Sequence, residues 1–429
     1  MVNNGNATTG RFGRRRFLKA TGAGAVAVGL AGCSDNGVDE DVFKIGHLAP
    51  LELDMGIGSE WSADIAVEQL NDAGGVMDTE VEVVHADTAA TPSEGVRQAE
   101  QLVESENVDV LIGTHASEVA LAIIDYVAEA RIPFLSTGTA APEVSTQNMG
   151  TDYERYEMVF RPGPANSSYQ VRQFGRYAEY LNDEHGWTTW ANLAENAAWT
   201  QFFTDNLPDQ LEDRGFNVPY NERISSETDD FAPILNAIED AGAEICVKQF
   251  SLLPGTGMLA AWRDNEYPFA QEGVSVPSMS PQYWDDTNGG CEYECTAETG
   301  GAGAPINDQT VAFTEEYASR HGDDRPSLPM YMGYCTYDAV NLYSEVVESV
   351  GTFDYANDLQ TIVDELKGVN YEGVAGPIEF GQEGSEFPHD VIADEGGQPF
   401  PVTQWIDGGK EAVFPREFAT ADHQAAPWI

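Results

Sequence analysis

Lysine is scarce in this sequence, whereas carboxylates are abundant. The 429 residues include 21 Lys and Arg against 72 Asp and Glu, so the formal net charge is −51 at pH 7. The acidic residues are dispersed through nearly every segment rather than gathered in one tail. Such a chain has little positive charge with which to neutralise phosphates, which argues against nucleic acid as a partner. A dispersed acidic surface suits molar salt, where charges are screened beyond ~3 Å.

Motifs that carry chemistry are also missing. No nucleophile–base constellation, phosphate-binding loop or Gly-x-Gly-x-x-Gly fingerprint stands in a fitting context. The seven histidines are scattered and none is paired at metal-ligand spacing, so we expect ordinary polar roles for His47 and His115. We therefore expect no enzyme activity, no cofactor and no metal.

The apolar run at the N-terminus is too short for a membrane span. It covers residues 20–32, whereas a transmembrane helix needs ~20 apolar residues. The basic segment before it contains Arg14-Arg15-Arg16-Phe17-Leu18-Lys19, which resembles a twin-arginine export motif. The run ends in Leu30-Ala31-Gly32-Cys33, which resembles a lipobox. We predict a signal peptide at 1–32, a linker at 33–42, and a protein held at the extracellular face of the cell membrane by a lipid on Cys33.

Four further cysteines remain once Cys33 is assigned to lipid. Cys291 and Cys295 flank Glu-Tyr-Glu in a Gly-rich loop, where an exported protein is expected to form a small disulfide. A metal-binding pair is the alternative. Cys246 and Cys335 lie within apolar segments and are expected to be buried small hydrophobes, and whether they pair is left open.

Strand-like and helix-like segments alternate from residue 43 onward. Short apolar runs at 43–48, 81–85 and 108–113 are separated by stretches of helical periodicity, and a similar alternation returns from 168 to 265. Short connections between such elements predict two α/β domains, each with a doubly wound parallel sheet. Two such domains with a cleft between them suit a ligand clamp.

Several sequence blocks occur in the order and spacing of one known family. They are Lys44-Ile45-Gly46, Ala66-Val67-Glu68-Gln69-Leu70-Asn71-Asp72-Ala73-Gly74-Gly75-Val76, Ile132-Pro133-Phe134-Leu135-Ser136, Phe160-Arg161 and Gly373-Val374-Ala375-Gly376-Pro377-Ile378-Glu379-Phe380. From residue 43 to about 415 the chain resembles the leucine/isoleucine/valine-binding proteins, the type I periplasmic binding fold that serves ABC importers. Together with its signal and its charge, it resembles a substrate-binding lipoprotein of the halophilic archaeal type.

The resemblance implies two lobes joined by three crossings, with the ligand cleft between them. Lobe one would comprise residues 43–163 and 283–372. Lobe two would comprise residues 164–282 and 373–429. The later helices would thus return to the first lobe.

Two loops that follow predicted strands are rich in hydroxyls and glycine, at 113–117 and 136–140. Ligands of parallel sheets bind beyond the carboxyl ends of the strands, and a helix N-terminus with a serine hydroxyl favours a carboxylate. A plain N-cap is the alternative role for Ser117. The resemblance implies a ligand site made of Ser117, Gly138, Thr139, Ala140, Met55, Trp199, Leu252 and Gln282.

The implied function is that of an extracytoplasmic receptor that delivers a small polar solute to ABC permease subunits after its lobes close. Branched-chain amino acids, amides and urea-like compounds are the candidate solutes. Gln282 stands where the family places an acid for the ligand's ammonium group, and a glutamine cannot supply that charge. We expect a monomer. The alternatives are a ligand-sensing subunit for a membrane signalling partner and, third, an exported enzyme.

Overall fold

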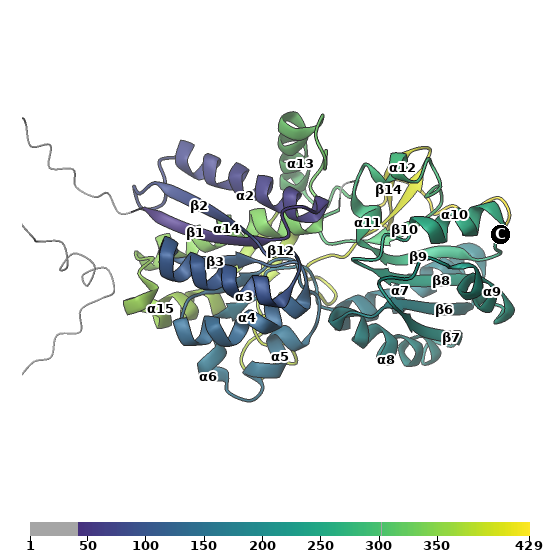
Figure 1. The fold of residues 1–429 in the computed structure, drawn as a ribbon, viewed down its shortest axis with the longest axis horizontal. Helices are drawn as coiled ribbons and strands as arrows, with labels where there is room; N and C mark the ends of the chain where they lie inside the picture. Colours follow the sequence, from purple (N-terminus) through teal and green to yellow (C-terminus); the bar gives the residue numbers. More distant parts are fainter. Residues whose placement is uncertain (1–41, 302) are drawn as a thin grey trace, which may run out of the picture.

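The computed structural model describes residues 42–301 and 303–429, which form two α/β lobes placed side by side (Figure 1). The predicted signal peptide, the lipidation site Cys33 and the linker up to residue 41 lie outside the described residues. Within the described part, no helix combines the length and the apolar character that crossing a bilayer requires.

Lobe one is built on a five-stranded parallel sheet of order β2-β1-β3-β4-β5. Its strands are β1 (Phe43–Ala49), β2 (Val81–Asp87), β3 (Val110–Gly113), β4 (Phe134–Ser136) and β5 (Val159–Phe160). All four residues of β3 are buried, and so are six of the seven in β1. Such continuous apolar runs are what a parallel sheet covered on both faces requires.

Helices cover both faces of this sheet. They are α2 (Asp54–Asp72), α3 (Pro92–Gln101), the π-helical turn η2 (Leu102–Glu106), α4 (Ser117–Ala130), α5 (Glu143–Met149), α6 (Tyr153–Tyr156), α13 (Asp308–His321), α14 (Tyr331–Val350) and α15 (Tyr355–Lys367). In α4, Val119, Ile123 and Val127 recur every four residues and are all buried, which gives the helix its apolar face. α14, late in the chain, packs beside α2, so lobe one is completed by a segment that returns from lobe two (Figure 1).

Lobe two has a four-stranded parallel sheet of order β7-β6-β8-β9 and a separate antiparallel sheet of order β10-β13-β14. The strands are β6 (Thr189–Glu195), β7 (Asn217–Ile224), β8 (Ile245–Phe250), β9 (Ala270–Ser275), β10 (Cys295–Ala297), β13 (Val402–Ile406) and β14 (Gly409–Phe414). The helices are α7 (Ser167–His185), α8 (Ala198–Glu212), α9 (Ala232–Asp240), α10 (Thr256–Asp264), α11 (Val276–Met279) and α12 (Tyr283–Asp286). The predicted fold class, two parallel-sheet α/β lobes, is confirmed.

The second and third crossings lie later in the chain than the predicted boundaries at 283 and 373. β10 pairs with β13, and Tyr283 belongs to the core of lobe two, so the chain from 283 to β10 still belongs to that lobe. The hairpin of β11 (Asn370–Gly373) and β12 (Gly376–Glu379) instead packs on lobe one, where Val374 joins a small core with Phe313. Strand pairing and apolar contacts, which motif order does not reveal, decide where each segment belongs.

The predicted disulfide is not formed. Cys291 and Cys295 are both free and buried, and they belong to different core clusters. Cys295 is the first residue of β10 and is buried, whereas Cys291 packs in the core around α12. Cys246 and Cys335 are buried free thiols, so the prediction that they serve as small hydrophobes is confirmed and no bond joins them.

The excess of carboxylates predicts that stability depends strongly on salt. We expect the midpoint of thermal unfolding to rise between 0.01 M and 1 M KCl, where the Debye length falls from ~30 Å to ~3 Å and self-repulsion is screened. Salt also screens the attraction within surface ion pairs, and this effect alone would lower the midpoint. A midpoint that stays flat or falls as KCl is added, with NaCl as the parallel series, would show that repulsion between carboxylates does not limit the stability of the fold.

Candidate functional site

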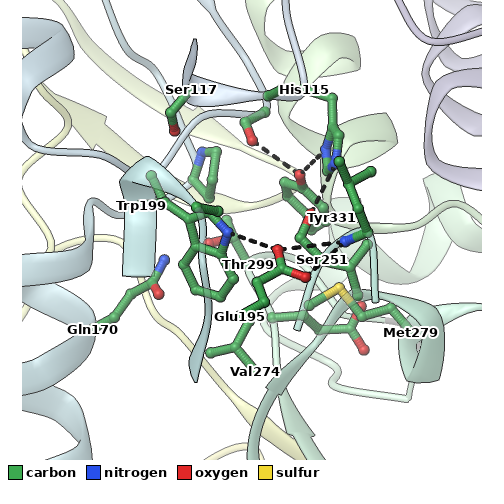
Figure 2. A pocket seen from close by; sticks show the side chains of 18 of the residues that line it. His115, Ser117, Gln170, Glu195, Trp199, Ser251, Val274, Met279, Thr299 and Tyr331 are labelled. Atoms are coloured by element: carbon green, nitrogen blue, oxygen red, sulfur yellow. Dashed lines mark hydrogen bonds between the residues drawn. The ribbon is translucent and has the colours of Figure 1, made fainter. Parts of the chain in front are cut away.

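A pocket lies between the two lobes, where strands of both sheets reach their carboxyl ends (Figure 2). Lobe one lines it with residues that follow β3 and β4, together with Tyr331 at the start of α14. Lobe two lines it with residues at or just beyond the ends of β6, β8 and β9. Open parallel sheets bind ligands beyond the carboxyl ends of their strands, and in this protein the strand ends of both sheets face the same pocket.

The floor of the pocket in lobe one is the N-terminus of α4. Ser117 is the first residue of this helix and is almost fully buried, while Ala116 occupies the N-cap position without a side-chain hydrogen bond. A plain N-cap role for Ser117 is therefore excluded. Its Oγ accepts a hydrogen bond from Ala141 N at 3.2 Å, which leaves the hydroxyl proton available to a solute. The positive end of the helix favours a negatively charged group at this point.

A hydrogen-bonded chain of side chains joins the lobes at the rim of the pocket. The Tyr331 hydroxyl donates to Gly138 O at 2.9 Å, so it must accept from His115 Nδ1 at 2.7 Å. This assigns the proton of His115 to Nδ1, and Nε2 then accepts from Ser251 Oγ at 3.0 Å. Burial lowers the pKa of His115 to about 4, so the ring is neutral near pH 7. His115 belongs to lobe one and Ser251 to lobe two, so their bond spans the cleft.

Glu195 is a buried carboxylate in the wall of the pocket. It ends β6 and is only 1% exposed. Its oxygens accept from Leu252 N at 3.1 Å and from Trp199 Nε1 at 3.4 Å (Figure 2). They also accept from Leu253 N at 3.0 Å. Burial raises the pKa of Glu195, while the backbone N–H donors oppose that rise. The carboxylate thus fixes the loop after β8 and orients the indole ring.

Five of the eight residues predicted for the site line the pocket, namely Ser117, Gly138, Ala140, Trp199 and Leu252. Their binding role remains a prediction. Gly138 is needed for close packing as well, because a Cβ there would lie 2.4 Å from Thr114 O.

The other three predicted residues do not line the pocket. Thr139 turns away from it, and its Oγ1 lies 2.6 Å from Ser136 Oγ. Met55 is buried in the core of lobe one. Gln282 Nε2 donates to Ser327 Oγ at 2.9 Å, so this side chain ties the lobes at their margin instead of facing the solute. In each case the side chain serves packing or contact between the lobes.

Sequence reasoning missed several lining residues. His115 was expected to have an ordinary polar role, and Glu195, Gln170 and Thr299 were not singled out. Gln170 and Thr299 are buried, and within the described residues Gln170 Oε1 and Thr299 Oγ1 have no hydrogen-bond partner. Buried polar atoms of this kind are costly unless something satisfies them, so these two mark places where a solute is expected to bind.

His47 was expected to have an ordinary polar role and lies apart from the pocket. It is fully buried in lobe one, where its Nε2 is 2.8 Å from Ser59 Oγ.

The lobes contact each other directly at the pocket and at its margin, so the structure is a closed arrangement. Ala198 N, at the start of α8, donates across the cleft to Glu118 Oε1 at 2.7 Å. At the margin, the Arg325 guanidinium contacts Asp54 of lobe one at 3.0 Å and Asp286 of lobe two at 2.7 Å.

Comparison with known proteins finds one family. A family profile described as "Periplasmic binding protein" matches residues 43–409. Leu/Ile/Val-binding protein homolog 6 of Brucella suis is 22% identical over 404 residues, which cover 91% of this chain and 94% of that protein. For homolog 7 of the same organism, the match of 24% identity spans 52% of this chain and 55%, about half, of the relative's length.

Solved structures share the fold at low sequence identity. A putative branched-chain amino acid ABC transporter from Silicibacter pomeroyi has a TM-score of 0.77 and 20% identity, and the match covers 91% of this chain and all of that one. An ABC transporter solute-binding protein from R. palustris, in complex with 4-hydroxybenzoate, has a TM-score of 0.70 and 16% identity, over 86% of this chain and 95% of that one. At these identities the likeness establishes the fold.

Proposed function

The chain belongs to the periplasmic binding protein family, and from this premise we propose that it is the extracytoplasmic solute-binding subunit of an ABC importer. The observation that carries the proposal is the buried pocket between two closed lobes, with unpartnered polar atoms at Gln170 and Thr299. The proposal includes a lipid anchor on Cys33 and ABC permease subunits as partners.

The solute's head group is proposed to lie on lobe one. Ser117 Oγ–H and the N-terminus of α4 together offer donors and positive potential, which suit a carboxylate. Beyond it, Trp199, Val274 and Met279 supply an apolar wall, and Trp199 lies between Ser117 and Gln170 in the view of Figure 2. A polar site for the head group followed by an apolar wall suits a solute with a carboxylate attached to a compact apolar body.

The far end of the solute is proposed to carry a hydrogen-bond donor. Gln170 Nε2 donates one N–H to Ala165 O at 2.7 Å, and Oε1, which has no partner among the described residues, can only accept. Thr299 Oγ1 is open as well and can accept or donate. A hydroxyl or amide N–H at the end of the apolar body would satisfy both residues.

A zwitterionic amino acid fits this pocket less well, because each lining carboxylate already has a partner with which an ammonium group would compete, and only Glu298 Oε2 is a buried carboxylate oxygen of the pocket without a hydrogen bond among the described residues. Glu118 accepts from Ala198 N, and Glu195 is held by backbone amides. Glu298 forms an ion pair with Lys410. We therefore propose a small carboxylate with an apolar body and a terminal donor, in preference to a branched-chain amino acid.

The mechanism is docking followed by closure. The solute docks on the loops of lobe one that carry Ser117 and Ala140, and lobe two then brings Trp199 and Gln170 against it. Closure makes the bonds from Ser251 to His115 and from Ala198 to Glu118, which an open form would lack. A solute that contacts both lobes binds the closed state better and so shifts the population toward it.

A titration series tests the solute class and the head-group site together. In molar KCl, we expect calorimetry to show 4-hydroxybenzoate binding more tightly than benzoate, and benzoate more tightly than leucine. Ser117→Ala should weaken the tightest of these by about tenfold, through the loss of one charge-assisted hydrogen bond. Ser344→Ala is the control, because Ser344 is equally buried but donates to Val340 O within α14.

Two results would contradict these expectations in different ways. Leucine as the tightest ligand, with binding abolished in Glu195→Gln, would make Glu195 the ammonium partner and overturn the solute class. An unchanged affinity in Ser117→Ala would show that the carboxylate of the solute does not bind at the N-terminus of α4.

A further inference from the structure

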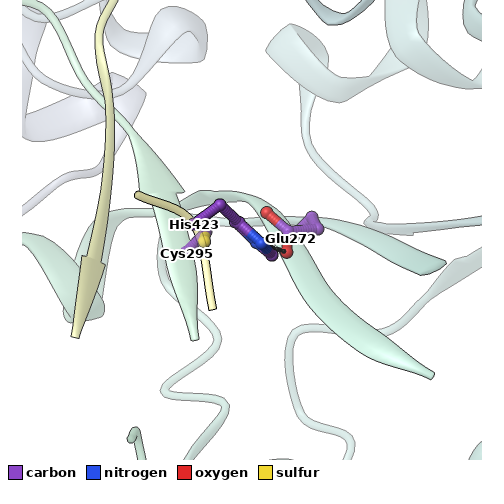
Figure 3. A group of neighbouring side chains, drawn as sticks. All are labelled: Glu272, Cys295 and His423. Atoms are coloured by element: carbon purple, nitrogen blue, oxygen red, sulfur yellow. Dashed lines mark hydrogen bonds and ion pairs between the residues drawn. The ribbon is translucent and has the colours of Figure 1, made fainter. Parts of the chain in front are cut away.

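Three side chains with metal-binding atoms meet in the interior of lobe two, and they are not among the residues that line the solute pocket (Figure 3). Glu272 lies on β9, Cys295 begins β10, and His423 belongs to the C-terminal segment that follows β14. All three are buried, and one ligand atom from each lies within 4.8 Å of the other two. We propose that Glu272, Cys295 and His423 bind a divalent transition-metal ion, with zinc as the best fit.

The donor set matches zinc in type and in charge. Thiolate, imidazole and carboxylate are the protein ligands that zinc takes. Deprotonated Cys295 and Glu272 together carry two negative charges, which balance a divalent cation in a buried place. With bonds of about 2.0–2.3 Å and tetrahedral angles, ligand atoms stand ~3.3–3.6 Å apart. Glu272 Oε1 and His423 Nε2 lie 3.0 Å apart, so they need to separate by only a few tenths of an ångström.

Three buried carboxylates lie in this part of lobe two, and Glu272 is the one that has no lysine or arginine partner among the described residues. The buried Glu294 has Lys248 Nζ at 2.9 Å, and the buried Glu298 is paired with Lys410. Glu272 has a tyrosine hydroxyl and an imidazole, but no ammonium or guanidinium group forms an ion pair with it among the described residues. A metal ion would give the third carboxylate what the other two already have.

Neighbouring side chains are placed to orient the ligands. His185 Nε2 lies 2.8 Å from His423 Nδ1, so an N–H on Nδ1 of His423 can donate to His185 and leave the Nε2 lone pair for the ion. The Tyr177 hydroxyl donates to Glu272 Oε2 at 2.8 Å, which leaves Oε1 facing His423. Metal-ligating histidines commonly have such a partner on their second ring nitrogen.

The bound ion would join three segments that no continuous sheet connects. It would tie β9 of the parallel sheet to β10 of the antiparallel sheet and to the C-terminal segment. On binding, Cys295 loses its thiol proton to solvent and the thiolate becomes the ligand. Three protein ligands leave the fourth position of a tetrahedral ion to a water molecule, and because the site is buried away from the solute pocket its role would be structural. The sequence indicated no metal, because these ligands are far apart in the chain.

Cobalt titration tests the site. Chelator-treated protein in molar KCl, which weakens adventitious binding to surface carboxylates, is titrated with Co²⁺. We expect one Co²⁺ per chain with the near-ultraviolet absorption of a thiolate–cobalt bond. Cys295→Ser and His423→Gln should lose this band, whereas Cys246→Ser should keep it, because Cys246 is an equally buried free thiol outside the set.

The wild-type titration is decisive even if a variant folds poorly. Absence of a thiolate–cobalt band at one equivalent would overturn the proposal, and so would a band that survives in folded Cys295→Ser. Zn²⁺ should raise the thermal midpoint of the wild type and of Cys246→Ser but not of Cys295→Ser. Solute binding in Cys295→Ser, measured by the same calorimetry, should be retained, so this proposal and the proposed transport function can fail separately.

Discussion

Replacing Arg161 by methionine should cost about 3–5 kcal/mol of folding free energy, the range for a buried charge that loses its partner. Arg161 and Asp390 are each 1% exposed, and the guanidinium contacts both carboxylate oxygens, with Nε to Oδ1 at 3.0 Å. Asn166 Nδ2 donates to the same carboxylate at 2.7 Å. Without Arg161, the Asp390 charge would stay buried with only this neutral donor.

The guanidinium of Arg161 also holds a loop of the candidate site. It donates to Ala141 O at 2.9 Å and to Thr139 O at 3.2 Å, on either side of the pocket residue Ala140. Arg161 follows β5 directly before the first crossing, and Asp390 precedes the third, so the pair fastens two of the three lobe connections. We therefore expect weaker solute binding together with the loss of stability.

Equilibrium unfolding in denaturant at high salt measures the effect. Arg172→Met is the matched control, because Arg172 makes exposed ion pairs with Glu386 and Asp394 and should cost less than about 1 kcal/mol. Removing both charges in Arg161→Met with Asp390→Leu should recover a large part of the loss, since no unpaired charge remains. Equal losses in the Arg161 and Arg172 variants would show that burial of the pair does not matter.

The part of the fold that sequence reasoning predicted is the part that depends on local pattern. Runs such as Val110–Gly113 and the helical spacing of Val119, Ile123 and Val127 predict a buried strand followed by a helix. The place of Ser117 follows, because parallel strands end at one edge of a sheet. Trp199 was found only through the resemblance to the family.

What the sequence could not predict depends on contacts between distant segments. β10 is three residues long, and only its pairing with β13 shows that it belongs to lobe two. Glu195, Gln170 and Thr299 belong to other segments than Ser117, and only the arrangement of the two lobes brings all four to one pocket. The disulfide prediction was wrong for a similar reason, since Cys295 faces Glu272 and His423 in the interior rather than Cys291.

Asp338 is predicted to make stability fall as pH rises from about 4 to about 7. This fully buried carboxyl in α14 accepts from Val374 N at 2.7 Å and from Ala375 N at 2.9 Å, at the turn between β11 and β12. Burial raises the pKa of Asp338 from 3.8 to about 7, even though both N–H donors oppose the rise. Within this window the folded state holds a proton that the unfolded state has released, so raising the pH favours unfolding. The full effect is about 4 kcal/mol.

The wild-type curve alone would not isolate this effect, because buried histidines act in the opposite direction. Burial lowers the pKa of both His115 and His389 to about 4, so between pH 4 and 6.5 the unfolded state binds more protons at these rings and stability rises with pH. The informative quantity is the wild-type free energy of unfolding minus that of Asp338→Asn, measured in molar KCl from pH 4 to 8. We expect this difference to fall by about 4 kcal/mol across the window, because the asparagine does not titrate. Glu227→Gln, at an exposed turn, is the control for replacing an acid by its amide. A flat difference curve for Asp338→Asn would show that the pKa of Asp338 does not change on folding.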